Sequence, residues 1–556
     1  MDEQNLMTKF RVPHYCASSG DPLTAAASSI IIDISLLFFG TWISNFLHLR
    51  HISWLPESGV FIVFGAIYGS ILLATEGKTA SLKLEFDALM LNLVLLPPII
   101  FYSGFSMHHS NFGANLSEIL VLAVVGTLVS TFGLGFSIYG LNGFGSGFSD
   151  YPTDLNIYEC LAFAALISAV DPVATLATFD ALQVDPNVEV LIFGESLLND
   201  AVAIVLYKSF AKFAQYGGVT DKFGYSDAGV SFLTLTFGSI LIGILCTVLQ
   251  ALVFKYTFFK HTPVLEILTF MFLAYSSFII AEYFHWSGII ASLLHGVGCA
   301  LFVKPNMSEE GHFRAELISH SLAALADMLI FIMVGYTGVS AVESVVDVSW
   351  ALTFWTLGLC LILRAVSTFP LVAVLNLCRK KHRQVGMNEA FLMWWSGLRG
   401  AIAIGLVADV PSAYRGTMMS STCLIVFFTV FVLGGGTATV LKKMGILMGI
   451  NRPKAHGELG GKIKQFHNIL IRLLTNQDEN DDGIDDRYQS HQYNREMSRR
   501  GSIVASTMQK RGTINVLNSA DLMSLTAKAN LEKTNAESEE SPEQTNDTNK
   551  STLNWE

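Results

Sequence analysis

The sequence predicts an all-α membrane protein that crosses the bilayer many times and ends in a soluble tail. Hydrophobic residues make up 51% of the chain, charged residues only 15%, and the mean hydropathy is +0.46. Soluble domains carry about 25% charged residues, so this composition is that of a polytopic membrane protein. The apolar residues are gathered into segments of about twenty residues, which is the length that a membrane helix needs.

The apolar segments follow one another between a polar start and a polar end of the chain. Residues 1–26 are expected to form a flexible N-terminal segment, and residues 442–556 a cytosolic tail that is partly helical and then disordered. Residues 27–441 are expected to form the membrane domain. About thirteen candidate spans lie near 27–47, 57–74, 88–105, 116–140, 157–180, 187–213, 229–255, 263–281, 285–303, 317–338, 348–378, 389–410 and 416–441.

Charge and cysteine content narrow the possible classes of partner. The net charge of −11 does not suggest a nucleic-acid partner, and much of it comes from acidic runs in the tail. Lys and Arg are more frequent in the connections that face the cytosol if the tail is cytosolic, which favours that orientation. The seven cysteines are scattered without a CxxC pair, so we expect no disulfide framework, no resident metal and no cofactor.

One apolar segment, Phe193–Tyr207, carries four polar residues that point to chemistry inside the membrane. Glu195 and Asn199 are four residues apart, as are Ser196 and Asp200, so on a helix each pair shares a face. A carboxylate in hydrocarbon is costly unless it faces a cavity, a partner or a cation. A satisfied polar core between helices is the alternative, but intramembrane ionisable groups usually mark an ion or proton path.

A second span contains Asp171 followed by Pro172. Proline lacks the N–H, and its ring clashes with the carbonyl of Ser168, so the helix should break here. Freed carbonyls at membrane depth are tolerated where they line a cavity, and a carboxylate beside them suits a hard cation. An ordinary proline kink is the alternative, although a kink alone does not require Asp171.

A third span has Arg399 between Gly397 and Gly400, two residues that weaken a helix. Two interrupted spans in the two halves of a membrane domain are typical of secondary transporters with inverted repeats. Arg399 would supply a fixed positive charge where the spans cross, either balancing helix ends or holding Asp171 ionised. A structural arginine that pairs with carbonyl groups is the alternative.

Other charged residues in apolar segments need partners. Arg364 lies inside the eleventh span, and Glu195 is its candidate partner, because a buried unpaired charge costs several kcal/mol. Asp327 lies in the tenth span and, like Glu195, Arg364 and Arg399, is expected to have a charge-pairing or structural role. Asp33 and Glu282 lie near span ends and are weaker candidates with a structural role.

Four motifs together resemble the eukaryotic sodium/proton exchanger family of monovalent cation/proton antiporters. They are Leu95–Ile100, Ile167–Thr175, Phe193–Asp200 and Gly397–Ile402, in consistent order over about residues 50 to 440. The likeness is greatest to the Golgi and endosomal branch. The resemblance implies a homodimer in which each protomer has a dimerisation part and a six-helix core part with two crossed, broken helices.

The resemblance also assigns roles by position. It makes Asp200 the main cation and proton carboxylate and Asn199 its neighbour, with Asp171, Ser196 and the backbone near Val170 completing the ion site.

The same resemblance makes Glu195 and Arg364 a buried ion pair. It also matches the Leu93–Phe105 segment to a cavity-lining span where amiloride-type inhibitors bind, with Leu96, Pro97 and Phe101 as lining residues. One departure is Tyr102, which stands where the family usually carries an acidic residue, and a phenol is neutral near pH 7.

The expected function is secondary active antiport rather than an enzymatic reaction. Asp200 would bind either a proton or a monovalent cation, Na⁺ and/or K⁺, and alternating access of an elevator type would carry it across. One cation against one proton is electroneutral, which the uncharged Asn199 fits. Such exchange would serve pH and cation homeostasis.

Three other functions are weighed against this one. An electrogenic antiporter or cation leak channel keeps the fold, and current would identify it. An intramembrane aspartyl hydrolase would use Asp171 and Asp200, but its sequence contexts are missing and Arg399 would be unexplained. A non-transporting ion sensor with a signalling tail is the third, and an intact ion site argues against it.

The tail suggests regulation. Residues 460–475 carry apolar residues at helical spacing, so this helix could lie on membrane lipids, bind a regulatory protein or pack on the transporter itself. Ser502 and Thr513 follow short basic runs that resemble kinase sites. The resemblance favours a Golgi or endosomal membrane, with the plasma membrane as the alternative.

Overall fold

A computed structural model describes most of the membrane domain. It covers residues 22–50, 55–76, 90–107, 109–144, 155–171, 179, 186–215, 225–257, 259, 262–343, 349–378, 384–444, 470 and 473–475, all within the compact unit 1–477. The regular elements in these ranges are helices, without a strand among them. Nine of these helices are long and apolar enough to cross a membrane, and shorter apolar helices accompany them. The predicted all-α, polytopic fold class is confirmed.

The helices follow the predicted spans in order. They are α2 (Pro22–Leu49), α3 (Glu57–Glu76), η1 (Leu91–Leu95), α6 (Leu96–Phe105), α7 (His109–Phe144), α8 (Ile157–Ser168), α10 (Pro186–Gln215), α11 (Tyr225–Tyr256), α12 (Pro263–Tyr283), α13 (Gly288–Gly298), η4 (Cys299–Val303), η5 (Lys304–Asn306), α14 (Glu309–Glu343), α15 (Trp350–Cys378), α16 (Met387–Trp395), α17 (Ala401–Val407), α18 (Arg415–Phe428), η7 (Thr429–Gly434) and α19 (Gly435–Met444). The first helix begins inside the segment that was expected to be flexible, and the last ends beyond Leu441.

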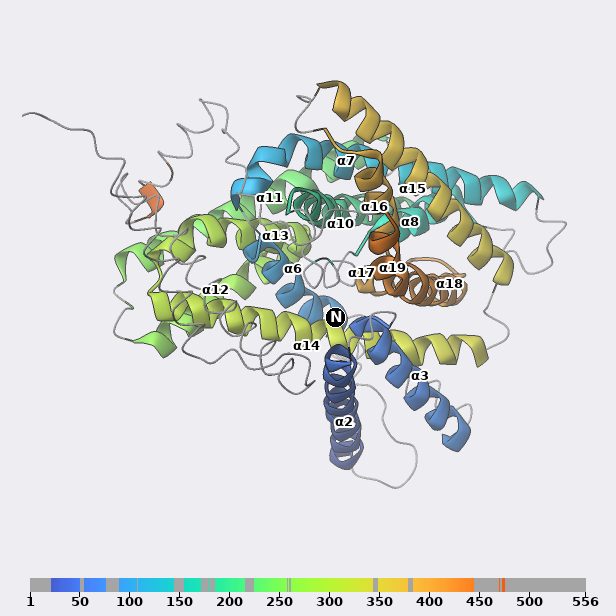
Figure 1. The fold of residues 1–556 in the computed structure, drawn as a ribbon, viewed down its shortest axis with the longest axis horizontal. Helices are drawn as coiled ribbons and strands as arrows, with labels where there is room; N and C mark the ends of the chain where they lie inside the picture. The colour runs from blue at the N-terminus through green and yellow to red at the C-terminus, as the bar shows by residue number, and fades with distance from the viewer. Residues whose placement is uncertain are drawn as a thin grey trace, which may run out of the picture. The chain divides into compact units, whose positions relative to one another are not determined.

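The helices pack as two groups (Figure 1). We call α2, α3, η1, α6, α11, α12, α13, η4, η5 and α14 the frame group, in which α14 packs along α3 and α6 packs on α13. We call α7, α8, α10, α15, α16, α17, α18, η7 and α19 the core group, in which α7 packs on α8, α10 and α15. The groups meet mainly where α10 contacts α11 and where α14 contacts α17 and α18.

Two short helices of the core group start with the same capping arrangement. At the start of α8, the Asn156 N–H donates to Glu159 Oε2 at 2.9 Å. At the start of α16, the Gly386 N–H donates to Glu389 Oε2 at 2.9 Å. A glutamate at the third helical position thus satisfies a backbone donor at each helix start. This fixes where each helix enters the bundle, and both then end early.

Glycines let the frame helices α6 and α13 approach closely. A Cβ on Gly104 would lie 2.5 Å from the Leu293 carbonyl oxygen, and one on Gly296 would lie 3.1 Å from the Phe105 nitrogen. Small residues at membrane helix contacts allow such backbone proximity. Because α6 and α13 are held together, their side chains form one continuous wall.

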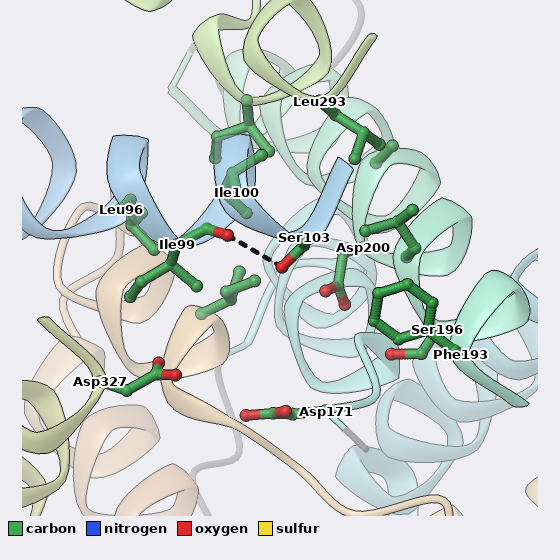
Figure 2. A pocket seen from close by; sticks show the side chains of 14 residues that line it. Leu96, Ile99, Ile100, Ser103, Asp171, Phe193, Ser196, Asp200, Leu293 and Asp327 are labelled. Atoms are coloured by element: carbon green, nitrogen blue, oxygen red, sulfur yellow. Dashed lines mark hydrogen bonds between the residues drawn. The ribbon is translucent and has the colours of Figure 1, made fainter. Parts of the chain in front are cut away.

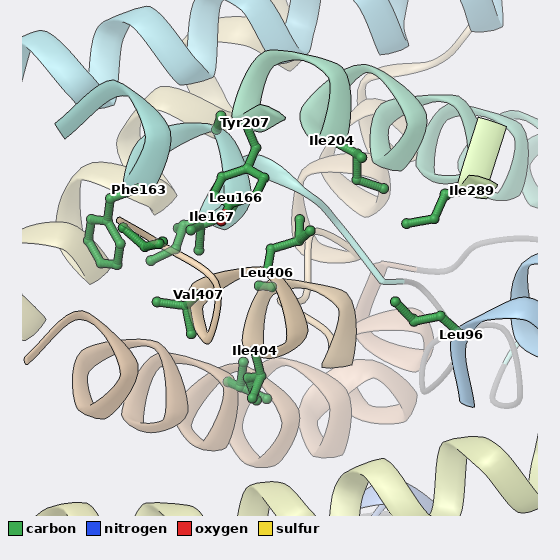
Figure 3. Close-up of a cluster of buried hydrophobic side chains, with 14 of the residues drawn as sticks. Leu96, Phe163, Leu166, Ile167, Ile204, Tyr207, Ile289, Ile404, Leu406 and Val407 are labelled. Carbon is green, nitrogen blue, oxygen red and sulfur yellow. The ribbon is translucent and has the colours of Figure 1, made fainter. Parts of the chain in front are cut away.

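Apolar side chains surround the short helices of the core group (Figure 3). The buried cluster joins α8, α10 and α17 with α6 and α13, through residues that include Leu96, Phe163, Leu166, Ile167, Ile204, Tyr207, Ile289, Ile404, Leu406 and Val407. This packing holds α8 and α17 in place beside the points where the helical backbone is interrupted.

The described part of the tail after α19, residues 470 and 473–475, packs on the frame group. Leu474 and Thr475 are buried, and Leu474 belongs to an apolar cluster with residues of α11 and η4. Lys255 Nζ donates to the Leu473 carbonyl at 2.8 Å, and Asn306 Nδ2 donates to the Leu474 carbonyl at 2.7 Å. Of the three destinations considered for the tail helix, these residues favour packing on the transporter itself.

Candidate functional site

A cavity of about 60 Å³ lies where the two groups meet (Figure 2). Its walls come from α6, α10, α13, α14 and α17 and from the chain just after α8. The lining residues are Leu96, Ile99, Ile100, Ser103, Asp171, Phe193, Ser196, Leu197, Asp200, Ala201, Ile289, Leu293, Asp327 and Ile402.

Three carboxyl groups face this cavity from three different elements. Asp200 comes from α10, Asp171 from the chain after α8, and Asp327 from α14. The sequence analysis treated Asp327 as structural, but it lines the same cavity as the two expected ion ligands. Like charges in an apolar enclosure repel and lose hydration, so protons or a cation must neutralise them. Among the described residues, no three acidic, His or Cys side chains are placed to hold a metal ion together.

The two interrupted helices cross beside this cavity. The Asp171 N–H donates to the Leu398 carbonyl at 2.9 Å, which ties the end of one interruption to the other. Arg399 Nη1 donates to the carbonyls of Ser168 at 2.9 Å and Ala169 at 3.2 Å. The guanidinium thus satisfies carbonyls that the break in the first helix leaves free, as a charge at a helix C-terminus should. The carbonyl-pairing interpretation of Arg399 agrees with these contacts.

Gly400 allows the crossing to be this close. A Cβ at this position would overlap the Asp171 side chain and lie 2.7 Å from its Cγ. The sequence identified Gly400 only as a residue that weakens a helix. Gly400 also lies directly against the Asp171 carboxylate. This contact depends on how the two helices cross, so it could not be predicted from the sequence.

Polar groups of α10 complete the wall opposite the break. Ser196 Oγ donates to the Val170 carbonyl, so the expected backbone position near Val170 lies in contact with α10. Asn199 does not line the cavity. It lies next to Asp200 on α10, is only 3% exposed, and its Oδ1 has no hydrogen-bond partner among the described residues. A buried acceptor without a donor is costly, so this oxygen is an available acceptor close to the cavity.

Glu195 and Arg364 form the expected buried pair. Their side chains keep 4% and 7% of their exposure. Arg364 Nη1 donates to Glu195 Oε1 and Nη2 donates to Oε2 at 3.0 Å, with a further bond from Nη2 to the Met393 carbonyl at 3.1 Å. Neither residue lines the cavity, so the pair joins α10 to α15 and α16 behind the site.

The helix α6 presents a different face to the cavity from the one predicted. Leu96 lines the cavity, but Pro97 and Phe101 do not. The lining residues Leu96, Ile99, Ile100 and Ser103 follow the spacing of one helix face, whereas Pro97 and Phe101 fall outside it. Phe101 instead packs against the rings of Phe270 and His295.

Other predicted positions lie elsewhere. The Tyr102 ring contacts His320 of α14 with ring centroids 5.1 Å apart. Pro172 and the possible phosphorylation sites Ser502 and Thr513 fall outside the described residues, as does the side chain of Asp33.

Comparison with known proteins agrees with this architecture. The family model described as "Sodium/hydrogen exchanger, transmembrane" matches residues 34–443. The chain belongs to the sodium/hydrogen exchanger family. Members of this family are transporters rather than enzymes, and the chain is an integral, multi-pass membrane protein.

Individual relatives match across most of the exchanger chain. The present chain is 36% identical to sodium/hydrogen exchanger 8 of Homo sapiens over 448 residues, which cover 79% of this chain and 73% of that protein. It is 35% identical to sodium/hydrogen exchanger 9 of Equus caballus over 400 residues, or 68% of this chain and 60% of that one. The sodium proton antiporter MjNhaP1 of Methanocaldococcus jannaschii at pH 8 has a similar fold, with a TM-score of 0.58 and 17% identity over 75% of this chain and 99% of that chain.

Proposed function

We propose that this exchanger moves Na⁺ and/or K⁺ in one direction and H⁺ in the other, with Asp200 as the carboxyl group that binds either ion. The observation that carries the proposal is the cavity in which Asp200 and Asp171 face each other at the crossing of two interrupted helices. Asn199 Oδ1, Ser196 and the backbone near Val170 would supply neutral oxygen ligands, which suit a hard monovalent cation. Ion gradients across the membrane would drive the exchange.

The charges around the site favour an electroneutral exchange. Glu195 and Arg364 neutralise each other outside the cavity, and Arg399 is directed at backbone carbonyls. Asn199 beside Asp200 is uncharged, so it adds no second titrating group. One carboxyl that takes one cation or one proton then moves no net charge. An electrogenic antiporter is the alternative, and Asp171 or Asp327 would have to take part in it.

The position of the cavity supports alternating access of the elevator type. Asp171 and Asp200 belong to the core group, whereas Leu96, Leu293 and Asp327 belong to the frame group. Movement of the core group along the frame group would therefore carry the carboxyl groups past a stationary wall and expose them to each side in turn.

The frame group would provide the contact between two protomers of a homodimer embedded in membrane lipids. The likeness of its motifs to the Golgi and endosomal branch supports a Golgi or endosomal membrane, with the plasma membrane as the alternative. The tail would lie in the cytosol, and the exchange would serve pH and cation homeostasis. A regulatory protein would compete for the tail near residues 460–475.

Reconstitution tests the proposal directly. Purified wild type and Asp200→Asn would be placed in liposomes with a trapped pH dye, and Na⁺ or K⁺ gradients imposed with the membrane voltage clamped. We expect a cation-driven pH change that does not depend on voltage and is absent in Asp200→Asn. A voltage-dependent signal would assign the electrogenic mode. No signal with any cation, in a folded sample also tested without residues after Lys443, would overturn antiport and leave the sensor function.

A further inference from the structure

Two polar contacts bridge the core and frame groups away from the ion cavity. In the first, Lys208 Nζ of α10 lies 2.9 Å from Glu282 Oε1 of α12 and donates to the Trp286 carbonyl at 3.3 Å. In the second, Asn92 Nδ2 of η1 donates at 2.8 Å to Oδ2 of Asp409, which follows α17. Each contact therefore pairs one residue of the core group with one of the frame group.

The two contacts lie in one cluster of charges. The charges of Lys208, Glu282 and Arg415 all act on the Asp409 carboxyl group. Lys208 on α10 thus joins Glu282 near the end of α12, Asp409 just after α17 and Arg415 at the start of α18, giving two acidic and two basic side chains. Because the cluster is balanced in charge, separating the groups would expose unpaired charges on both sides of the boundary.

The frame half of the first contact is held in a fixed shape. Glu282 Oε1 also accepts the Gly288 N–H at 2.9 Å, and the Trp286 N–H donates to the Ala281 carbonyl at 2.9 Å. Between them, His285 has a φ of 57°, a conformation that a residue with a side chain rarely adopts. Such strain persists where the surroundings over-determine it. The turn therefore presents both acceptors to Lys208 from a rigid position.

The cluster lies on the side of the membrane opposite the tail. Lys255, at the end of α11, binds the Leu473 carbonyl of the tail. The helix α12 starts close after α11 and runs about 30 Å before it reaches Glu282. On α10, Lys208 lies about 12 Å beyond Asp200 along the helix axis. With the tail in the cytosol, both contacts are on the non-cytosolic side of the ion site.

We propose that these contacts form an outer latch, made by Lys208–Glu282 and Asn92–Asp409, which closes the non-cytosolic side of the ion cavity. The latch rests on the proposed function, because movement of the core group along the frame must break both contacts in each transport cycle. The Lys208 and Glu282 side chains keep 26% and 32% of their exposure. An ion pair this exposed favours one state only roughly two- to fivefold, so the latch biases the equilibrium without preventing transport.

Cross-linking tests whether the contact has to open. Lys208→Cys and Glu282→Cys would be combined, joined with a reversible bifunctional thiosulfonate in liposomes, and assayed for cation-driven pH change before and after reduction. We expect exchange by the double variant to stop on cross-linking and to return on reduction. Treatment with the same reagent should not change exchange by either single-cysteine variant. Full exchange in the cross-linked protein would overturn the latch. Absence of exchange in wild type would instead contradict the proposed function.

Labelling tests the bias without transport. The variant Ile289→Cys, on the cavity wall, would be labelled from the non-cytosolic side with a membrane-impermeant thiol reagent. We expect Lys208→Met to label roughly two- to fivefold faster than the parent, and the charge exchange Lys208→Glu with Glu282→Lys to restore the parent rate.

The matched control is Arg314→Met, which removes an exposed ion pair to Glu310 within α14 and should leave labelling unchanged. Equal labelling in Lys208→Met and Arg314→Met would show that the contact closes nothing. If Lys208→Met does not fold, Asn92→Ala replaces it in the labelling test, with the same expected rise in labelling.

Discussion

The buried pair of Glu195 and Arg364 gives a prediction whose size follows from the structure. We consider Arg364→Met, Glu195→Leu and the double variant, which replace each charged side chain with an apolar one of similar length. Both side chains are almost fully buried, at 7% and 4% exposure. Removing one partner leaves the other as an uncompensated buried charge, which costs about 3–5 kcal/mol.

The double variant is expected to be less damaging than either single one. Arg364 Nε has no partner among the described residues, so the pair does not recover the full cost of removing two charges from water. Replacement of a whole buried ion pair by apolar residues is often neutral, or stabilising by about 1–4 kcal/mol. The coupling energy between the two positions should therefore amount to several kcal/mol.

The measurement is thermal unfolding of the purified protein in detergent, followed by tryptophan fluorescence and by loss of the monodisperse peak in size exclusion. The control is Arg314→Met, an exposed pair within one helix that should change stability by at most about 1 kcal/mol. Destabilisation of the double variant equal to the sum of the single variants would refute the reasoning, because it would mean that the two side chains act independently.

Three further predictions concern the site and the tail. Gly400→Ala places a Cβ 2.7 Å from Asp171 Cγ, so we expect a folded protein, destabilised by about 1–3 kcal/mol, that loses cation-driven pH change; full exchange would contradict the close crossing. Asn199→Asp adds a second carboxyl beside Asp200, and we expect pH change in liposomes to become sensitive to membrane voltage. Asn306→Ala removes the 2.7 Å bond to Leu474, and amide exchange at Leu474 and Thr475 should accelerate roughly two- to tenfold.

The sequence predicted the interruptions because their causes are local. The missing N–H of Pro172 and the flexible Gly397 and Gly400 weaken a helix wherever it packs. The capping box that starts α8 at Asn156 is local as well. The contact between Gly400 and Asp171 is not local, because the residues come from different halves of the chain. Only the crossing brings them together, so sequence reasoning found both residues and missed their relation.

The difference between the predicted and observed lining residues on α6 has a related origin. The predicted lining residues were transferred with a motif, and a motif gives positions along the chain rather than a helix face. Ser103 shares the face of Leu96, Ile99 and Ile100, so helical spacing applied from Leu96 would have found it. The same limit applies to Asp327, whose burial in a span was visible but whose direction was not. Which face of a membrane helix meets a cavity depends on its neighbours.

The arrangement of fixed charges around the cavity suggests why Asp200 would need a proton or a transported cation to neutralise it. Arg399 donates to the carbonyls of Ser168 and Ala169, where it offsets the negative end of a broken helix rather than a carboxylate. Glu195 is already matched by Arg364. In these hydrogen bonds neither guanidinium group contacts Asp200. Under the proposed function, neutralisation of Asp200 would be left to a proton or a transported cation, and this would make the binding of the two mutually exclusive.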